Sequence, residues 1–381
     1  MKLCEKSRWR QWMERLRNSL SLNMEKVAII LVNYKDYVNR FLLECRDGLR
    51  AQNYDHQDYQ VYIVDNASSE ESRSFIAINY PEAKIIPRTD GNYSAANNAG
   101  IAQAIKNGFE LFAIVNMDTR FDPNWLVELV FAVNSKPTVG IAQSKILLNP
   151  KDDLEALDPF INSVGNIMHY LGFGYTGGLG QKNSRFQEEE IKEIGGYASG
   201  CSLITKKEVL DKIGWYDEEY YMYHDDIELG WRAKLAGYRI VLAPRSIIYH
   251  KYEFSRSIRM FYYMERNRYL VMFSFYKLPT IIAILPMMIF MEAGMILYSI
   301  INRRLGVKLS TGKYFLRPAC WRHIREVRRR LRTFRQKKDK EIMADFSGEI
   351  LFQEVASPLL KYIANPITKA YWLLIKKIIF W

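Results

Sequence analysis

The sequence predicts an α/β protein with a doubly wound, mostly parallel sheet, followed by a helical region that associates with a membrane. From residue 26 on, short apolar runs alternate with stretches that have the spacing of amphipathic helices, as in chains built from β-α units. Polar residues follow directly after three of these apolar runs. Beyond residue 258 the chain changes to long apolar and strongly basic stretches.

The first four predicted strands lie within residues 27–115. Val27–Val32 and Tyr59–Val64 are continuous apolar runs, which is typical of strands that are buried on both faces of a parallel sheet. Shorter strands are predicted at Ala83–Ile86 and Leu111–Val115, and helices at Asp36–Gln52, Ser69–Asn79 and Ser94–Lys106. Three successive β-α units indicate a doubly wound sheet with right-handed crossovers.

The second half of this domain has a less regular pattern. Val139–Leu148 and Ile240–Tyr249 have the apolar character of strands, and an amphipathic helix is predicted to begin near Asp225. Between the two strands lies a polar, glycine-rich segment, residues 149–196, whose length is typical of a mobile substrate loop.

The chain has 381 residues and a formal net charge of +12, which two stretches account for. Residues 1–24 hold six Lys or Arg against two Glu and are predicted to form a basic amphipathic helix, and residues 322–340 hold ten against two acids. Such stretches bind nucleic acid or anionic lipid, because both present dense negative charge. Neighbouring apolar segments favour lipid, so we expect membrane lipids as partners and no nucleic acid.

Residues 278–301 are long and apolar enough for a membrane core, but they include Pro279, Pro286 and Glu292. The segment spans the membrane, re-enters it or lies flat, and we favour a shallow or re-entrant element. Basic residues on both sides give no orientation. Ile367–Trp381 is too short to span and suits an interfacial anchor.

Cysteine usage and the chain start favour a cytosolic location. The four cysteines are far apart and form no CxxC pair, which argues against a disulfide framework and a zinc site. The first 24 residues have no apolar core of signal-peptide length, so secretion is not expected.

Polar residues gather where three predicted strands end. They are Asn33, then Asp65 with Asn66, then Asn116 with Asp118. In open α/β sheets ligands bind beyond the carboxyl ends of the strands. A carboxylate such as that of Asp118 ligates Mg²⁺ or Mn²⁺, whose charge neutralises a departing diphosphate. A turn that caps the next helix explains Asn116 and Asp118 equally well.

Two later motifs carry ionisable groups. Asp225, Asp226 and Glu228 stand at the start of a predicted helix, where the macrodipole alone explains acidic residues. A carboxylate beside a cleft is also suited to remove a proton from an acceptor hydroxyl. His250 ends the last predicted strand; a lone histidine is usually structural, but imidazole is also a good Mn²⁺ ligand.

Taken in order, these motifs resemble glycosyltransferase family 2, and in particular its rhamnosyltransferase-like branch. The resemblance covers residues 26–270. It is carried by the first strand with Asn33-Tyr34, the second strand end Asp65-Asn66-Ala67-Ser68, the segment Asp90–Gly100, the segment Ser199–Lys207, Ile213–Glu218, the Asp225-Asp226 helix, Gly237-Tyr238 and finally His250. No single motif is specific, but their combination in this order is.

The resemblance implies a GT-A fold with a Rossmann-like nucleotide-binding core and an inverting displacement at the anomeric carbon. It implies that Asp226, or its neighbour Asp225, is the catalytic base, and that Asp118 and His250 bind Mg²⁺ or Mn²⁺. The donor-binding residues that it implies are Asn33, Asp65, Asn66, Asn92, Asn97, Asn116 and Asp118. Two departures concern the chemistry: Asn116 replaces the first acid of the family's DxD motif, and Asp225-Asp226 replaces its Glu-Asp pair.

The expected protein is a transferase at the cytoplasmic face of a membrane, with its catalytic domain at residues 25–258 and a helical, membrane-associated region at 259–381. Residues 149–196 are expected on the acceptor side. The branch favours rhamnose from TDP-rhamnose, moved to a lipid-linked or polysaccharide acceptor. The alternatives are a non-catalytic sugar- or lipid-binding scaffold and a sugar nucleotidyltransferase, although no glycine-rich triphosphate loop follows the first strand.

Overall fold

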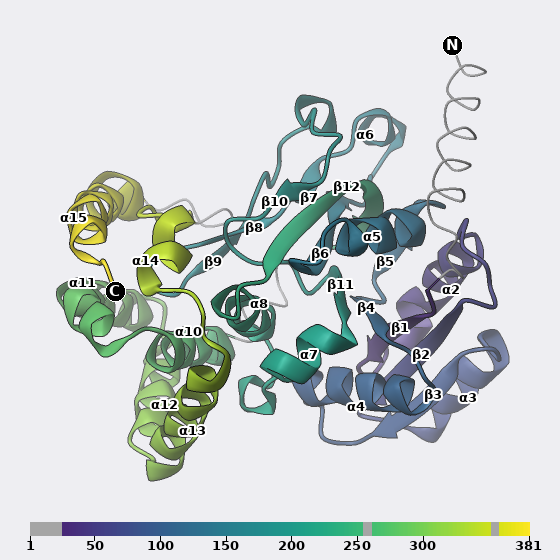
Figure 1. The fold of residues 1–381 in the computed structure, drawn as a ribbon, viewed down its shortest axis with the longest axis horizontal. Coiled ribbons are helices and arrows are strands. Elements are labelled where there is room, and N and C mark those ends of the chain that lie inside the picture. Colours follow the sequence, from purple (N-terminus) through teal and green to yellow (C-terminus); the bar gives the residue numbers. More distant parts are fainter. Residues whose placement is uncertain (1–24, 254–260, 352–357) are drawn as a thin grey trace.

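The computed structural model describes residues 25–253, 261–351 and 358–381. The helix predicted for residues 1–24 and the domain boundary predicted at residue 258 lie outside the described residues. The described chain has the predicted class: an α/β domain is followed by a helical C-terminal region (Figure 1).

A mixed sheet forms the centre of the domain, in the order β10-β12-β6-β11-β4-β1-β2-β3. Its purely parallel part consists of β1 (Val27–Asn33), β2 (Tyr59–Asn66), β3 (Lys84–Arg88) and β4 (Leu111–Val115). β6 (Val139–Leu148) and β12 (Arg239–His250) are parallel to each other, and β11 (Ser202–Lys206) runs antiparallel between β4 and β6. The mostly parallel sheet that the sequence predicts is therefore confirmed.

Helices cover both faces of this sheet, as a doubly wound fold requires. One face carries α2 (Tyr37–Arg50), α3 (Glu70–Asn79) and α5 (Trp125–Asn134); the other carries α4 (Tyr93–Lys106), α7 (Lys207–Ile213) and α8 (Asp225–Leu235). Alternate residues of β1 belong to two different cores. Ile29 lies in the core on the side of α2, α3 and α5, and Ile30 lies in the core on the side of α4, α7 and α8. A strand that is apolar at every position is explained by this double burial.

Two short strands pair with the side of β12 that β6 leaves open. β5 (Thr119–Phe121) pairs antiparallel with the end of β12, so that His250 lies opposite Thr119. β10 (Lys192–Glu193) pairs with the same side of β12 nearer its start, at Val241 and Leu242. In β12 a bulge between Ala243 and Ile247 accommodates Pro244, which cannot donate to a strand ladder.

The segment 149–196 differs from the mobile loop that its composition predicts. It contains α6 (Asp153–Leu157), β7 (Ile161–Ser163), β8 (Asn166–Met168) and β9 (Gly174–Thr176). Tyr170 and Leu171 are fully buried, and the Tyr170 ring stacks on Trp372 of the C-terminal region at 4.8 Å. Apolar residues that are scattered among the glycines therefore give this segment a fixed packing.

The C-terminal region consists of α10 (Phe261–Phe275), α11 (Leu278–Ile301), α12 (Leu305–Phe315), α13 (Pro318–Phe334), α14 (Asp339–Ile342) and α15 (Asn365–Ile378). α11 is one unbroken helix that includes Pro286, so of the shallow or re-entrant element that we favoured, the form with a re-entrant turn is not seen and the shallow form stays a prediction. Among the described residues it is the one helix long and apolar enough to cross a membrane.

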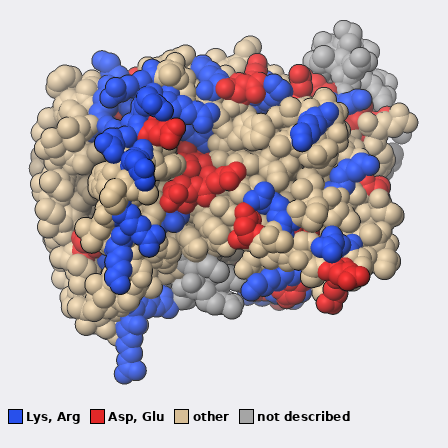
Figure 2. Space-filling model, turned by 90° about the horizontal axis from the view of Figure 1, so that it is seen from below, with Lys and Arg blue, Asp and Glu red and all other residues tan. Residues whose placement is uncertain are grey.

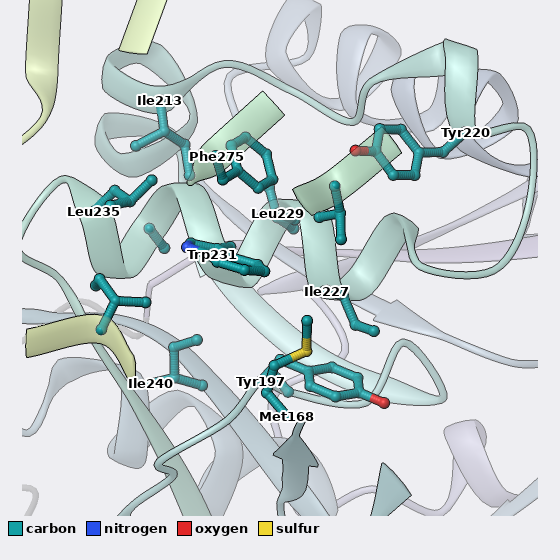
Figure 3. Packing of buried hydrophobic residues seen from close by; sticks show 14 of the residues in the cluster. Met168, Tyr197, Ile213, Tyr220, Ile227, Leu229, Trp231, Leu235, Ile240 and Phe275 are labelled. Atoms are coloured by element: carbon teal, nitrogen blue, oxygen red, sulfur yellow. The ribbon is translucent and has the colours of Figure 1, made fainter. Parts of the chain in front are cut away.

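α8 lies between the sheet and the C-terminal helices (Figure 3). Its Trp231 contacts Phe275 of α10, with ring centroids 5.5 Å apart, and Tyr276, at 5.0 Å. Figure 3 shows Ile227 and Trp231 on the same helix facing Tyr197 and Met168 on the opposite side. Because one hydrophobic core includes residues of α8, α10 and the sheet, the two regions are packed as a single unit around α8.

Candidate active site

The ends of β1 and β2 are tied together by Asn33 and Asp65. The Asn33 amide donates to Asp65 Oδ1 at 2.6 Å, and the Ser72 hydroxyl of α3 donates to Asp65 Oδ2 at 2.7 Å. Asn33 Oδ1 accepts from the Val38 backbone at 3.0 Å. Both carboxylate oxygens of the fully buried Asp65 are thus engaged within the protein, where they join two strands to α3.

The asparagines around α4 have different surroundings. Asn92 caps the helix by accepting from the Ala95 backbone at 3.1 Å, and it donates to the carbonyl of Glu218 at 2.9 Å. The side-chain oxygens of Asn66 and Asn97 are buried and have no hydrogen-bond partner within the described chain. Since buried polar atoms are nearly always paired in folded proteins, these two acceptors are suited to donors of a bound ligand.

Asp118 and His250 face each other at the ends of β4 and β12. His250 Nε2 lies 3.4 Å from Asp118 Oδ1, and His250 Nδ1 contacts Asn162 Oδ1 at 2.9 Å. All three side chains are buried. Burial lowers the pKa of His250, but Cys201 and Asp118 outweigh it and raise this pKa above its ordinary value.

A carboxylate and an imidazole at this spacing fit a divalent cation. Adjacent ligands of a six-coordinate Mg²⁺ stand about 3 Å apart, which is close to the observed separation of Asp118 and His250. No group of three or more His, Cys, Asp or Glu that could hold a metal ion occurs in the described part of the chain. A cation held by this pair would therefore need oxygen ligands from a diphosphate and from water.

Asn116 lies close in sequence to Asp118 and carries an amide in place of a carboxylate. Its side-chain oxygen accepts from the Tyr93 hydroxyl at 3.1 Å, and its backbone nitrogen donates to the carbonyl of Cys201 at 3.0 Å. The Asn116 side chain is therefore anchored to α4, and it adds no negative charge to the Asp118–His250 pair.

The acidic pair at the start of α8 consists of two unlike carboxyl groups. Asp225 is 5% exposed, and burial together with the charge of Asp226 raises its pKa well above the ordinary range. Asp226 is half-buried, and burial raises its pKa to about 6, although the backbone amides of Gly200 and Ile227 donate to it and lower the pKa. Of the two carboxyl groups, Asp226 has the less raised pKa and is held by two backbone N–H donors, so Asp226 is the better candidate for the ionised proton acceptor.

Two adjacent residues connect the region of the Asp118–His250 pair with the acidic pair Asp225–Asp226. Gly200 donates its backbone N–H to Asp226 at 3.1 Å, and the carbonyl of Cys201 accepts from the backbone of Asn116. The Asp118-bearing turn and Asp226 are thus linked through the two residues that precede β11. The structure brings together the two acidic motifs that the sequence placed more than one hundred residues apart.

The chain enters α8 through a turn of unusual geometry. Tyr221, Tyr223 and His224 have φ angles of 63°, 61° and 61°. Left-handed backbone at residues other than glycine costs roughly 1–3 kcal/mol each and tends to occur at functional sites. The turn ends at Asp225, so its conformation sets the direction in which the two acids point.

Several residues of this site were missed by the sequence analysis. Asn162 contacts His250 from β7, Tyr93 holds Asn116, and Gly200 holds Asp226. Asn162 has no local signal, because its neighbour is 88 positions away. Ser199-Gly200 was noted for its resemblance to the family, but nothing in the sequence showed which side chain its backbone N–H would contact.

Comparisons with known proteins agree with these features. A family model described as Glycosyl transferase family 2 matches residues 27–214. The O-antigen biosynthesis protein RfbC of Myxococcus xanthus is 29% identical over 247 residues, which are 61% of this chain and 18% of that protein. The N-acetylglucosaminyl-diphospho-decaprenol L-rhamnosyltransferase of Mycobacterium tuberculosis is 23% identical over 208 residues, which are 50% of this chain and 66% of that protein.

Among solved structures, a mannosyltransferase from Pyrobaculum calidifontis in complex with GDP-Man and Mn²⁺ is similar with a TM-score of 0.46 and 16% identity. The alignment covers 81% of this chain and 86% of that one. The chain spans about a fifth of RfbC and two thirds of the mycobacterial enzyme. The family match over the sheet, together with the motifs placed at its strand ends, shows that the chain belongs to glycosyltransferase family 2, whose catalytic fold is of the GT-A type.

Proposed function

We propose that this protein is an inverting glycosyltransferase that moves a sugar from a nucleotide-sugar donor to a glycan or lipid-linked glycan acceptor. The observation that carries this proposal is the link through Gly200 and Cys201, which connects Asp226 to the strand end that bears Asn116 and Asp118. We take Asp226 as the general base and this strand end as the diphosphate-binding edge. An inverting displacement needs these two sites on opposite sides of one sugar ring.

In the proposed reaction Asp226 accepts the proton of the acceptor hydroxyl. The hydroxyl oxygen attacks the anomeric carbon, and the bond from that carbon to the diphosphate oxygen breaks on the opposite face. The nucleoside diphosphate leaves with the bonding electrons. A divalent cation held by Asp118 and His250 would supply positive charge for this leaving group. Asn66 and Asn97 offer acceptors to hydroxyl or amide groups of the donor.

For the donor we propose a nucleoside-diphosphate sugar of the deoxyhexose type, with TDP-rhamnose as the first candidate. The rhamnosyltransferase-like order of motifs supports this choice, and so does the similarity to the mycobacterial L-rhamnosyltransferase. The diphospho-decaprenol acceptor of that relative also supports a polyprenyl-diphosphate-linked acceptor here. The name of the Myxococcus relative supports a role in cell-surface polysaccharide synthesis.

We further propose that the protein works on the cytoplasmic face of a membrane, with α11 lying along the surface. One side of α11 exposes large apolar residues at helical spacing, which are Leu278, Ile282, Leu285, Ile289, Leu297 and Ile301. The opposite side is buried through residues such as Met287, Met291 and Met295. Polar contacts flank it: Lys308 of α12 donates to Glu292 at 2.8 Å, and the Ala283 carbonyl accepts from Tyr371 of α15 at 2.6 Å. A helix fixed along its length to the protein is suited to lie in the interface.

The distribution of basic residues also supports contact between the C-terminal region and a membrane surface. Figure 2 shows Lys and Arg gathered over the C-terminal helices on the left of the view. α13 contributes the exposed residues Arg322, Arg325, Arg329, Arg330 and Arg332. Each basic residue near an anionic lipid surface contributes about 1 kcal/mol of attraction. The described cysteines, which are Cys45, Cys201 and Cys320, are buried free thiols, in keeping with a reducing compartment.

The test is release of nucleoside diphosphate from a panel of nucleotide sugars, with detergent-solubilised protein and with Mg²⁺, Mn²⁺ or EDTA. For wild type we expect turnover of one donor class. Asp226→Asn is expected to lose about 100- to 10,000-fold in kcat while it still binds the nucleotide. Asp225→Asn keeps the Asp226 carboxylate and is expected to lose far less. Asp211→Asn, an exposed residue of α7, is the matched control.

The possible outcomes separate the claims. Undiminished turnover by Asp226→Asn would refute the base assignment. Turnover that persists in EDTA would show that the Asp118–His250 pair acts without a cation. Nucleotide binding with no turnover of any donor, in the presence of polyprenyl-linked acceptors, would favour the non-catalytic scaffold.

A further inference from the structure

The middle turn of α10 is an unusual place in the protein. Its four consecutive polar residues, Glu265, Arg266, Asn267 and Arg268, are between 0% and 6% exposed. Consecutive residues of a helix point in different directions, so this turn is surrounded by protein on all sides. Buried polar side chains are retained where they satisfy other buried polar groups, which raises the question of what these four residues contact.

Two of them contact the turn that leads into α8. Asn267 Nδ2 lies within hydrogen-bond distance of three carbonyl oxygens, those of Tyr220 at 2.8 Å, Met222 at 3.0 Å and Tyr223 at 2.7 Å. Arg266 donates to the carbonyls of Glu219 and, at 3.0 Å, Tyr220. The Asn267 side-chain oxygen accepts from Arg266 Nε at 2.9 Å, which turns the amide nitrogen toward the carbonyls.

The backbone at these carbonyls is the left-handed segment already described. Tyr221 has φ 63° and ψ −61°, and the Met222 N–H donates to the Tyr220 carbonyl at 2.7 Å. This three-residue turn is strained for any residue with a side chain. The Tyr220 carbonyl, which closes this turn, accepts hydrogen bonds from both Arg266 and Asn267. Both side chains therefore contact the strained turn directly.

We propose that Arg266 and Asn267, here called the α10 clamp, are positioning residues that hold residues 219–224 in the conformation that aims Asp226 at the acceptor. The proposal rests on the proposed function, because it takes Asp226 as the base. Neither clamp residue touches a reacting atom. The clamp fixes the peptide units that precede Asp225, and these determine where α8 begins.

The rest of α8 is held independently of the clamp. Trp231 packs against Phe275 and Tyr276, and Arg232 binds the carbonyls of Ile213 and Gly214 at 2.6 and 2.8 Å. Loss of the clamp therefore loosens the first turn of α8 while its second and third turns stay in place. The turn also contacts the start of α4, because the Tyr221 carbonyl accepts from the backbone N–H groups of Tyr93 and Ser94 at 2.8 and 3.2 Å. We expect the chemical step to suffer most and donor binding to change less, through α4.

The experiment compares Asn267→Leu with wild type in the full-length protein. We expect kcat to fall about ten- to hundredfold, as for a small misplacement of a catalytic group, and KM for the donor to rise by a much smaller factor. Amide hydrogen exchange of residues 219–227 is expected to accelerate, and this readout needs no turnover. Asn365→Leu is the matched control, because Asn365 also makes two backbone bonds in the C-terminal region, to Ile350. It should lower thermal stability to a similar degree and leave kcat within about twofold.

Arg266→Met provides a second variant that keeps the Asn267 amide and removes two donors to the turn. It should give the same pattern with a smaller loss of kcat. Unchanged kcat and unchanged exchange at 219–227 in folded Asn267→Leu or Arg266→Met would overturn the proposal, as would an equal loss of kcat in Asn365→Leu. Failure of the proposed function looks different: Asp226→Asn would then stay active, while faster exchange in Asn267→Leu would still show that the clamp holds the turn.

Discussion

Neighbouring polar residues at the strand ends have different tasks. Asp65 uses both carboxylate oxygens to tie β1, β2 and α3 together. The buried side-chain oxygen of Asn66, in contrast, has no hydrogen-bond partner within the described chain. A polar residue at a strand end can thus serve the scaffold or a ligand, and only its contacts distinguish the two. We propose that Asp65 acts on the donor chiefly by fixing the Asn33 and α3 positions.

The raised pKa of Asp226 predicts the pH dependence of the reaction. A general base must be unprotonated, and burial raises the pKa of this carboxyl to about 6. Activity is therefore expected to be full above about pH 7 and to fall about tenfold for each unit below about pH 6. The measurement is kcat/KM for nucleoside diphosphate release between pH 5 and 8, with donor affinity by calorimetry as the control. A profile that stays flat down to pH 5 would contradict the role of Asp226.

At the residue scale the sequence predicts strand-end residues well and cross-chain partners poorly. Asn33, Asp65 and Asp118 were found because parallel strands end at one edge of the sheet, a rule that needs no coordinates. Asn162 and Asn267 were not found, because their partners are His250 and a turn more than forty positions away. The composition around Asn267 does not reveal that four consecutive polar residues of α10 are buried.

At the scale of one element, α8 depends on a buried ion pair. Arg232 and Glu228 are 4% and 1% exposed, and Arg232 also donates to the carbonyls of Ile213, Gly214 and Trp215. Burial raises the pKa of Glu228 to about 6, although Arg232 lowers it. The pair therefore fastens α8 to the segment that follows α7.

Arg232→Met is expected to reduce the free energy of unfolding by about 3–5 kcal/mol, because it leaves a buried carboxylate and three carbonyls without their donor. Denaturant unfolding followed by fluorescence measures this change. The comparison variant is Lys207→Met, which removes the exposed Lys207–Asp211 pair and should cost less than about 1 kcal/mol. Equal effects of the two substitutions would show that the Glu228–Arg232 pair adds nothing to stability.

Helices were easier to predict than their interruptions. The predicted helices α2, α3 and α4 are present within two residues of their expected ends. For α11 two prolines suggested a broken element, yet Pro279 stands in the first turn, where no backbone donor is needed, and Pro286 lies inside a helix that is packed against α12 and α15. Tertiary packing here outweighs the loss of one backbone bond, and a sequence pattern does not contain this information.

At the scale of the whole molecule, the membrane proposal predicts a measurable loss of vesicle binding. Ile282→Asp combined with Ile289→Asp places two charges on the exposed side of α11, where both residues are more than 60% exposed. We expect wild type to sediment with anionic phosphatidylglycerol vesicles and this variant to stay in the supernatant, because a charge in the acyl region costs about 2.5–3.5 kcal/mol.

The matched control is Ile78→Asp with Leu157→Asp, two apolar residues of the catalytic domain that are 78% and 84% exposed. This variant should sediment like wild type. Neutral phosphatidylcholine vesicles and high salt separate the contribution of the basic residues of α13 from that of α11, since salt screens the former. Binding that is unaffected by the α11 substitutions would place the membrane contact elsewhere on the protein.

The position of β11 has a consequence for how the chain folds as it is synthesised. β1 to β4 pair with one another within the first 115 residues, but β6 joins them only through β11, which begins at Ser202. Until β11 emerges from the ribosome, β4 has an unpaired edge and β6 has no place in the sheet. Unpaired strand edges are sites of aggregation, so the interval between residues 115 and 202 is the period in which the nascent protein most needs a chaperone.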